Sequence, residues 1–194
     1  MEVQLTDTKW PATLFDDVGD PRRPGLHLGE VTRSLQNASG LGYKGDGFND
    51  MQLTAEIGLL WEEVLRRVMK EKYAVRPPQI IEDGIWMSLD GVNNDLIPGD
   101  DPAGEVPIVV EEYKATWKSI KSSPLDNFAY MMQVKSYCRA IGTKVAVMRI
   151  FHIMGDYRGS GPQYRVARIK FTEKELELNW DMILRHKESH FADR

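Results

Sequence analysis

Apolar residues recur every three or four positions in several parts of the chain, and this period predicts amphipathic helices. The strongest pattern covers residues 51–73, where one stripe contains Leu53, Ile57, Leu60, Trp61, Val64 and Val68. Further helices are predicted near 29–36, over 124–140, and over 173–187 with Thr172 as the N-cap.

Four other segments predict strands, because they are rich in β-branched and aromatic residues. They cover 79–89, 106–116, 144–154 and 164–171. The order of the elements predicts an α/β fold in which a central mixed β-sheet is flanked by helices. The sequence has no internal repeat or linker, so we expect one domain over residues 1–194 with an irregular arm over 1–25.

Composition places the chain among ordinary globular proteins, with 42% hydrophobic and 28% charged residues. The single cysteine, Cys138, excludes a disulfide within the chain and a cysteine-built zinc or iron–sulfur site, and it is predicted to lie in the core. The longest apolar stretches, such as 145–150, are too short for a membrane span, and the polar start lacks a signal-peptide core. We therefore expect a cytoplasmic protein with no membrane partner.

The formal charge of −4 argues against a protein that coats DNA by bulk electrostatics. Charge is unevenly spread, however, because residues 83–112 contain eight carboxylates and no Lys or Arg. Such a stretch can attract a divalent cation. Within it, the part from 95 to 105 is rich in Asn, Gly and Pro and is predicted to be a solvated loop.

One strand carries alternating charged residues at its end. Because side chains on a strand alternate between faces, Glu112 and Lys114 should point one way while Glu111 and Tyr113 point the other. These residues directly follow the apolar run 106–110, where a charge needs a partner or a function to offset its burial.

A second carboxylate should join this pair. If the strands on either side of the 90–105 loop pair antiparallel, Asp90 lies beside Glu112. Two carboxylates at that distance repel each other, and a bound Mg²⁺ would relieve the repulsion. Another acid-x-Lys sequence, at 7–9, has no apolar strand before it and is given no role.

The flanking helices add candidates. Glu62 shares a helical line with Ala55, Gly58, Leu65 and Met69, so it should face protein and needs a partner there. It is interpreted either as a metal ligand, directly or through water, or as the partner of Arg66 in a helical ion pair.

On the helix 124–140, Gln133 and Tyr137 share a face one turn apart, and either support the site or form a polar pair of the core. Four cations follow the charged strand and could contact phosphates, although surface solubility explains each one equally well: Lys118, Lys121, Lys135 and Arg139.

Together these residues resemble the PD-(D/E)XK nuclease superfamily, and within it the lambda-type (YqaJ-like) phage exonucleases and the RecB-like nucleases. Residues 58–62 resemble the helical Gly-x-x-x-Glu motif, 89–91 the Pro-Asp-Gly motif with Leu for Pro, and 112–114 the Glu-x-Lys motif. Residues 129–134 resemble a helical segment of the lambda-type enzymes, and 133–137 fit the Gln-x-x-x-Tyr signature of the RecB-like enzymes.

The resemblance implies a restriction-endonuclease-like core that hydrolyses phosphodiesters by metal-activated water. Asp90, Glu112, the backbone carbonyl of Tyr113 and Glu62 would hold Mg²⁺ or Mn²⁺, without an iron–sulfur cluster. Lys114 would orient or deprotonate the water and stabilise charge on the phosphate. The substrate would be contacted by Gln133, Tyr137, Lys118, Lys121 and Lys135.

We therefore expect a DNA exonuclease that acts on DNA ends in phage or bacterial recombination or repair, in the bacterial host cell if a phage encodes it. The alternatives are an endonuclease with the same centre, and a catalytically silent protein that binds nucleic acid or assembles with partners. Whether the chain forms a homo-oligomer, or acts with a single-strand annealing or recombination protein, stays open.

Overall fold

The computed structural model describes most of the predicted elements. Its described residues are 24–42, 56–61, 63, 64, 67, 75–93 and 108–192. Within the predicted helix 51–73, the described residues are helical. Glu62, almost all of the N-terminal arm and the acidic loop 95–105 lie outside the described residues.

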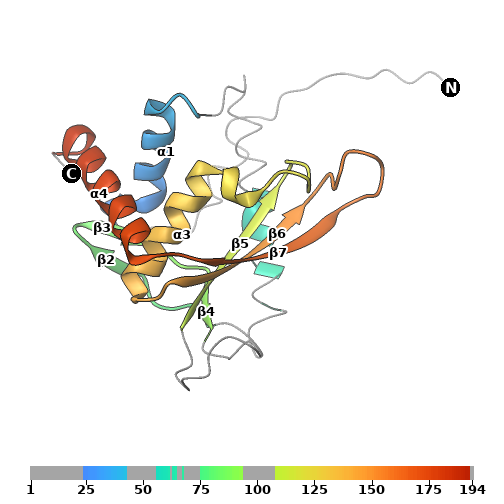
Figure 1. Ribbon diagram of the computed structural model, residues 1–194, viewed down its shortest axis with the longest axis horizontal. Helices are drawn as coiled ribbons and strands as arrows, with labels where there is room; N and C mark the ends of the chain where they lie inside the picture. Colours follow the sequence, from blue (N-terminus) through green and yellow to red (C-terminus); the bar gives the residue numbers. More distant parts are fainter. Residues whose placement is uncertain are drawn as a thin grey trace.

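A four-stranded mixed sheet forms the centre of the molecule, as predicted (Figure 1). Its order is β4 (Gly91–Asn93), β5 (Val109–Thr116), β6 (Val145–His152) and β7 (Gln163–Lys170). The β4–β5 and β6–β7 pairs are antiparallel, whereas β5 and β6 are parallel. The chain crosses from β5 to β6 through a helix, as a parallel pair requires.

The predicted strand 79–89 is wrong, because this segment is a hairpin. Strand β2 (Ile80–Glu82) turns back into β3 (Ile85–Met87), which also pairs in parallel with β1 (Leu26–His27) in a small second sheet. The reversal occurs at Asp83 and Gly84, whose φ angles are +48° and +74°. Asp-Gly is a preferred pair for such a two-residue turn, because both positions need positive φ.

Three helices are described in full: α1 (Leu28–Ala38), α3 (Phe128–Ile141) and α4 (Glu173–His190). The Thr172 cap of α4 is confirmed. Helix α3 begins later than predicted, because Pro124–Asp126 forms a separate 3-10 turn (η2) and the side chain of Asn127 then caps α3 by accepting from the Tyr130 N–H. In the described part of the chain, no helix combines the length and apolar character that a bilayer crossing requires.

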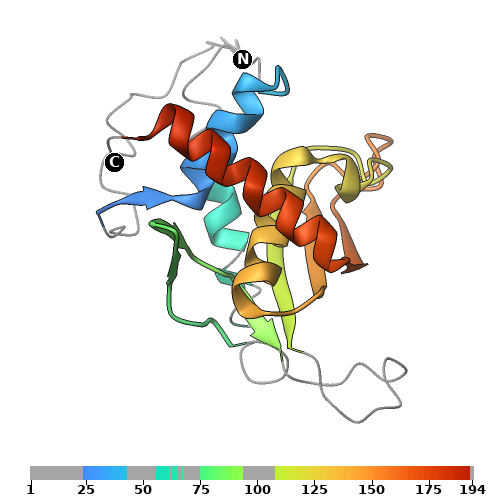
Figure 2. The same ribbon diagram turned by 60° about the vertical axis from the view of Figure 1, so that its left-hand side comes forward.

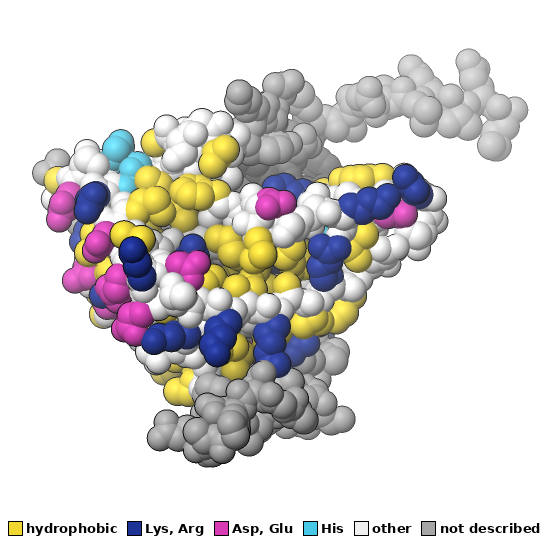
Figure 3. Space-filling view, in the orientation of Figure 1, with side chains coloured by type: hydrophobic (Ala, Val, Ile, Leu, Met, Phe, Trp, Pro, Cys, Tyr) yellow, Lys and Arg dark blue, Asp and Glu magenta, His cyan; other side chains and the backbone are white. Residues whose placement is uncertain are grey.

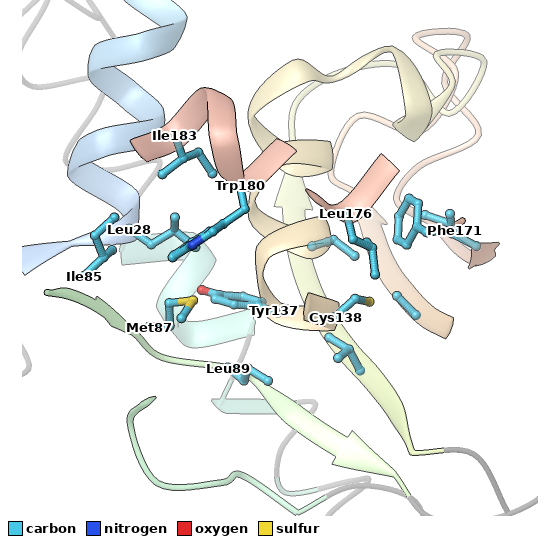
Figure 4. Close-up of a cluster of buried hydrophobic side chains, with 14 of the residues drawn as sticks. Leu28, Ile85, Met87, Leu89, Tyr137, Cys138, Phe171, Leu176, Trp180 and Ile183 are labelled. Atoms are coloured by element: carbon cyan, nitrogen blue, oxygen red, sulfur yellow. The ribbon is translucent and has the colours of Figure 1, made fainter. Parts of the chain in front are cut away.

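The main hydrophobic core lies where α1, α3 and α4 pack together against the sheets. Figure 2 shows α4 running across α1 and α3. Figure 4 shows Trp180 and Ile183 of α4 meeting Leu28 of α1 and side chains of the β3 region. Cys138 is fully buried there, which confirms its predicted place in the core. This core fixes α3 over β5, the strand that carries the charged residues.

Candidate active site

Strand β5 separates its charged side chains as its alternation predicts. On the face toward α3, the Lys114 ammonium forms an ion pair with Oε1 of the fully buried Glu112. Across the strand, the guanidinium of Arg149 on β6 donates to both oxygens of Glu111, at 2.7 and 3.1 Å. The two adjacent glutamates therefore have different partners on different faces of the sheet.

Asp90 joins Glu112 and Lys114 from the position directly before the neighbouring strand β4. Gly91 pairs with Glu111, so the predicted antiparallel pairing is confirmed and Asp90 lies at the level of Glu112. Oδ2 of Asp90 accepts a hydrogen bond from the Tyr113 N–H at 2.7 Å. Glu112 also lowers the pKa of Asp90, which places the two carboxyl groups close to each other.

Asp90, Glu112 and Lys114 are together called the group below, and their electrostatics follow from their burial. Burial raises the pKa of Asp90 above its ordinary value, although Lys114, the Tyr113 N–H and Arg76 oppose this rise. Burial alone would lower the pKa of Lys114, but Glu112 and Asp90 raise it above its ordinary value. Lys114 is therefore an ammonium at neutral pH, held between two carboxyl groups.

A chain of hydrogen bonds connects α3 to the segment that carries Asp90. The Gln133 side-chain amide donates to the Tyr137 hydroxyl at 2.8 Å, and that hydroxyl donates to the Ser88 carbonyl at 2.9 Å. Figure 4 shows the Tyr137 ring reaching from α3 toward Met87. Burial, followed by the charges of Glu112 and Asp90, raises the pKa of Tyr137. Gln133 and Tyr137, both predicted from the sequence, thus lie next to the group and hold the backbone at Ser88, two residues before Asp90.

The structure places the four predicted phosphate-binding cations in different parts of the molecule. Lys118 and Lys121 are exposed in the loop that follows β5. The structure does not bring Lys135 to the same place, because its ammonium lies 5.7 Å from the ring of Phe171, just before α4. Arg139 is also elsewhere, since it forms ion pairs with Glu82 and Glu177.

Two residues near the group were missed from the sequence. The ring of Tyr130 lies 5.6 Å from Nζ of Lys114, and its position three residues before Gln133 on α3 could have indicated this. Arg76 is among the groups that lower the pKa of Asp90. It is brought there by backbone hydrogen bonds between Val75 and Val92, a long-range pairing with no local sequence pattern.

The donor atoms of this group suit a hard divalent cation. Asp90 and Glu112 supply carboxylate oxygens, and Mg²⁺ commonly binds through one or two carboxylates while it keeps several waters. No cluster of three or more His, Cys, Asp or Glu side chains suited to a metal occurs among the described residues. The further predicted ligand, Glu62, lies outside them.

No family model matches the sequence. No curated protein is recognisably similar to it in sequence. The fold is similar to that of several solved structures, which include the alkaline exonuclease LHK-Exo from Laribacter hongkongensis and the same exonuclease in complex with dAMP. Their sequences are 15% and 13% identical to this chain, and each has a TM-score of 0.53.

Both alignments cover 87% of this chain and 89% of the exonuclease chain, so the likeness extends over nearly the whole of each protein. The predicted fold class is confirmed, and the predicted resemblance to exonucleases is confirmed as a likeness of fold.

Proposed function

We propose that this protein is a metal-dependent DNA exonuclease that hydrolyses phosphodiester bonds at DNA ends in phage or bacterial recombination or repair. One observation carries the proposal: Asp90, directly before β4, lies beside the Glu112–Lys114 ion pair of β5, and the Tyr113 N–H donates to the Asp90 carboxylate. Action at ends, rather than within a strand, is proposed because the structural neighbour is an exonuclease.

In this proposal Asp90 and Glu112 would hold Mg²⁺ or Mn²⁺, with help from the Tyr113 carbonyl and Glu62. When bound, the divalent cation supplies Lewis-acid polarisation of the phosphate and makes water more acidic. Tyr137 and Gln133 keep the backbone at Ser88 in place, and thereby keep Asp90 next to Glu112.

The position of Lys114 supports its proposed role. Its ammonium pairs with Glu112 and also interacts electrostatically with Asp90. We assign it the tasks of orienting or deprotonating the attacking water and of stabilising negative charge on the phosphate.

The test is digestion of matched linear and closed-circular duplex DNA with Mg²⁺. The wild type should degrade the linear DNA, leave the circle intact and stop when EDTA is added. Lys114→Ala should be about 10²- to 10³-fold slower, the usual effect of removing one charge-stabilising group. Lys144→Ala is the matched control, because Lys144 is half exposed and pairs with Glu173 at the start of α4.

Equal rates for Lys114→Ala and the wild type would contradict the assigned centre. Cleavage of the circle would instead identify an endonuclease. Absence of metal-dependent cleavage by a folded wild type would favour the catalytically silent alternative.

A further inference from the structure

The segments that follow β5 and β6 are joined into one body beside the proposed active site. We call residues 117–123 and 153–162 together the tip. The Ile120 N–H donates to the Gly155 carbonyl at 2.9 Å, and the Tyr157 hydroxyl donates to the Trp117 carbonyl. Figure 1 shows the two segments side by side at one end of the molecule.

The tip presents two aromatic side chains to solvent. Trp117 is 39% exposed and Tyr157 is 58% exposed. Tyr157 also has a φ angle of +61°, a left-handed conformation that residues with side chains rarely adopt. The hydrogen bonds of its N–H to the Met154 carbonyl and of its hydroxyl to Trp117 hold it in this conformation. The tip therefore fixes an exposed ring in place.

The charges of the tip are mainly positive, although the whole chain carries −4. Lys118, Lys121 and Arg158 are exposed there. The tip's one carboxylate, Asp156, accepts from the Arg158 N–H and the Ser160 hydroxyl, both at 2.8 Å, so it shapes the turn. Figure 3 shows Lys and Arg side chains gathered at this end of the molecule.

The tip is also close to the proposed catalytic group along the same strand. Trp117 follows Lys114 by three residues, which is roughly 10 Å at the usual rise of a strand. The tip therefore begins within about 10 Å of the proposed catalytic group along the chain.

We infer that the tip is a binding platform for single-stranded DNA, with bases stacked on Trp117 and Tyr157 and phosphates paired with Lys118, Lys121 and Arg158. Exposed aromatic rings beside cations are the combination that binds single strands without reading their sequence. A duplex would meet the cations but not the rings, because its base faces are already stacked. The inference rests on the proposed function and specifies the form of DNA at the same site.

The experiment measures the Kd of the full chain for a fluorescent oligo(dT) and for a blunt duplex of equal length, in EDTA so that no hydrolysis occurs. Trp117→Ala should weaken single-strand binding about tenfold, the usual effect of losing one stacked base. Duplex binding should change less than twofold, and Trp117→Phe should restore most of the single-strand affinity. Leu178→Ala, an exposed apolar residue on α4, is the control.

The cations are tested by salt titration with the same oligo(dT). Lys121→Ala should reduce the slope of log K against log salt concentration by about 0.7, as expected for one lost phosphate contact to a single strand. An unchanged slope would remove Lys121 from the platform.

Three outcomes would overturn the inference: equal loss on both DNAs, no loss for Trp117→Ala, or Trp117→Phe binding as weakly as Trp117→Ala. Because binding is measured without hydrolysis, this result is independent of the Lys114→Ala assay. Suppose that the nuclease assay detects no activity while Trp117→Ala still weakens binding to oligo(dT) more than binding to the duplex. In that case the proposed function fails and the binding platform stands.

Discussion

Glu111 and Glu112 are neighbours in sequence and both are fully buried, yet their environments differ because a strand sends them to opposite faces. The alternation of β5 was enough to predict this separation and the pairing of Glu112 with Lys114. It was not enough to predict Arg149 as the partner of Glu111, because that contact depends on the register of β5 and β6. The local sequence pattern thus predicts the face to which each side chain points, whereas the residue that it contacts depends on how the strands pair.

The ion pair between Glu111 and Arg149 should contribute to the stability of the fold. Arg149→Met leaves a buried carboxylate without its counter-charge and should lower the free energy of unfolding by about 3–5 kcal/mol in urea denaturation. The double variant Glu111→Leu with Arg149→Met should recover at least half of that loss, because no uncompensated charge remains. A double variant as unstable as the single one would contradict a charge-based explanation.

At the scale of elements, helix α4 and its Thr172 cap could be predicted because both depend on neighbouring residues. The β2–β3 hairpin was missed although Asp83 and Gly84 form a favoured turn, since the apolar residues around them also fit one longer strand. The position of Asp90 beside Glu112 could be predicted, because it follows from antiparallel pairing of the strands on either side of one loop. Arg76 was missed because an isolated bridge between distant segments places it there.

The hydrogen bonds from α3 to Ser88 connect two elements and thereby hold Asp90 in position. Tyr137→Phe removes the donor to the Ser88 carbonyl and the acceptor of Gln133. We expect a stability loss of about 1–2 kcal/mol, typical of a buried polar group left unpaired, and a lower kcat with little change in KM. Tyr164→Phe, whose hydroxyl contacts Arg149 at the surface, is the control. A wild-type kcat in Tyr137→Phe would show that these hydrogen bonds serve stability alone.

At the scale of the whole molecule, the sheet and its covering helices place the side chains of Glu112 and Lys114, two of the proposed catalytic residues, on the α3 side of β5. The class of the fold could be predicted from the order of its elements. The division into two sheets could not, because the two residues of β1 pair with a hairpin almost sixty residues later in the chain and have no strand pattern of their own.

We propose that Asp90 and Glu112 form one divalent-cation site, and calorimetric titration with Mn²⁺ tests this claim. The wild type should bind Mn²⁺ saturably, and Asp90→Asn and Glu112→Gln should each weaken binding at least tenfold, since losing a ligand costs at least as much as losing a residue that orients one. Glu188→Gln, exposed on α4, should bind as the wild type does. Equal Mn²⁺ affinity in all four proteins would contradict the claim.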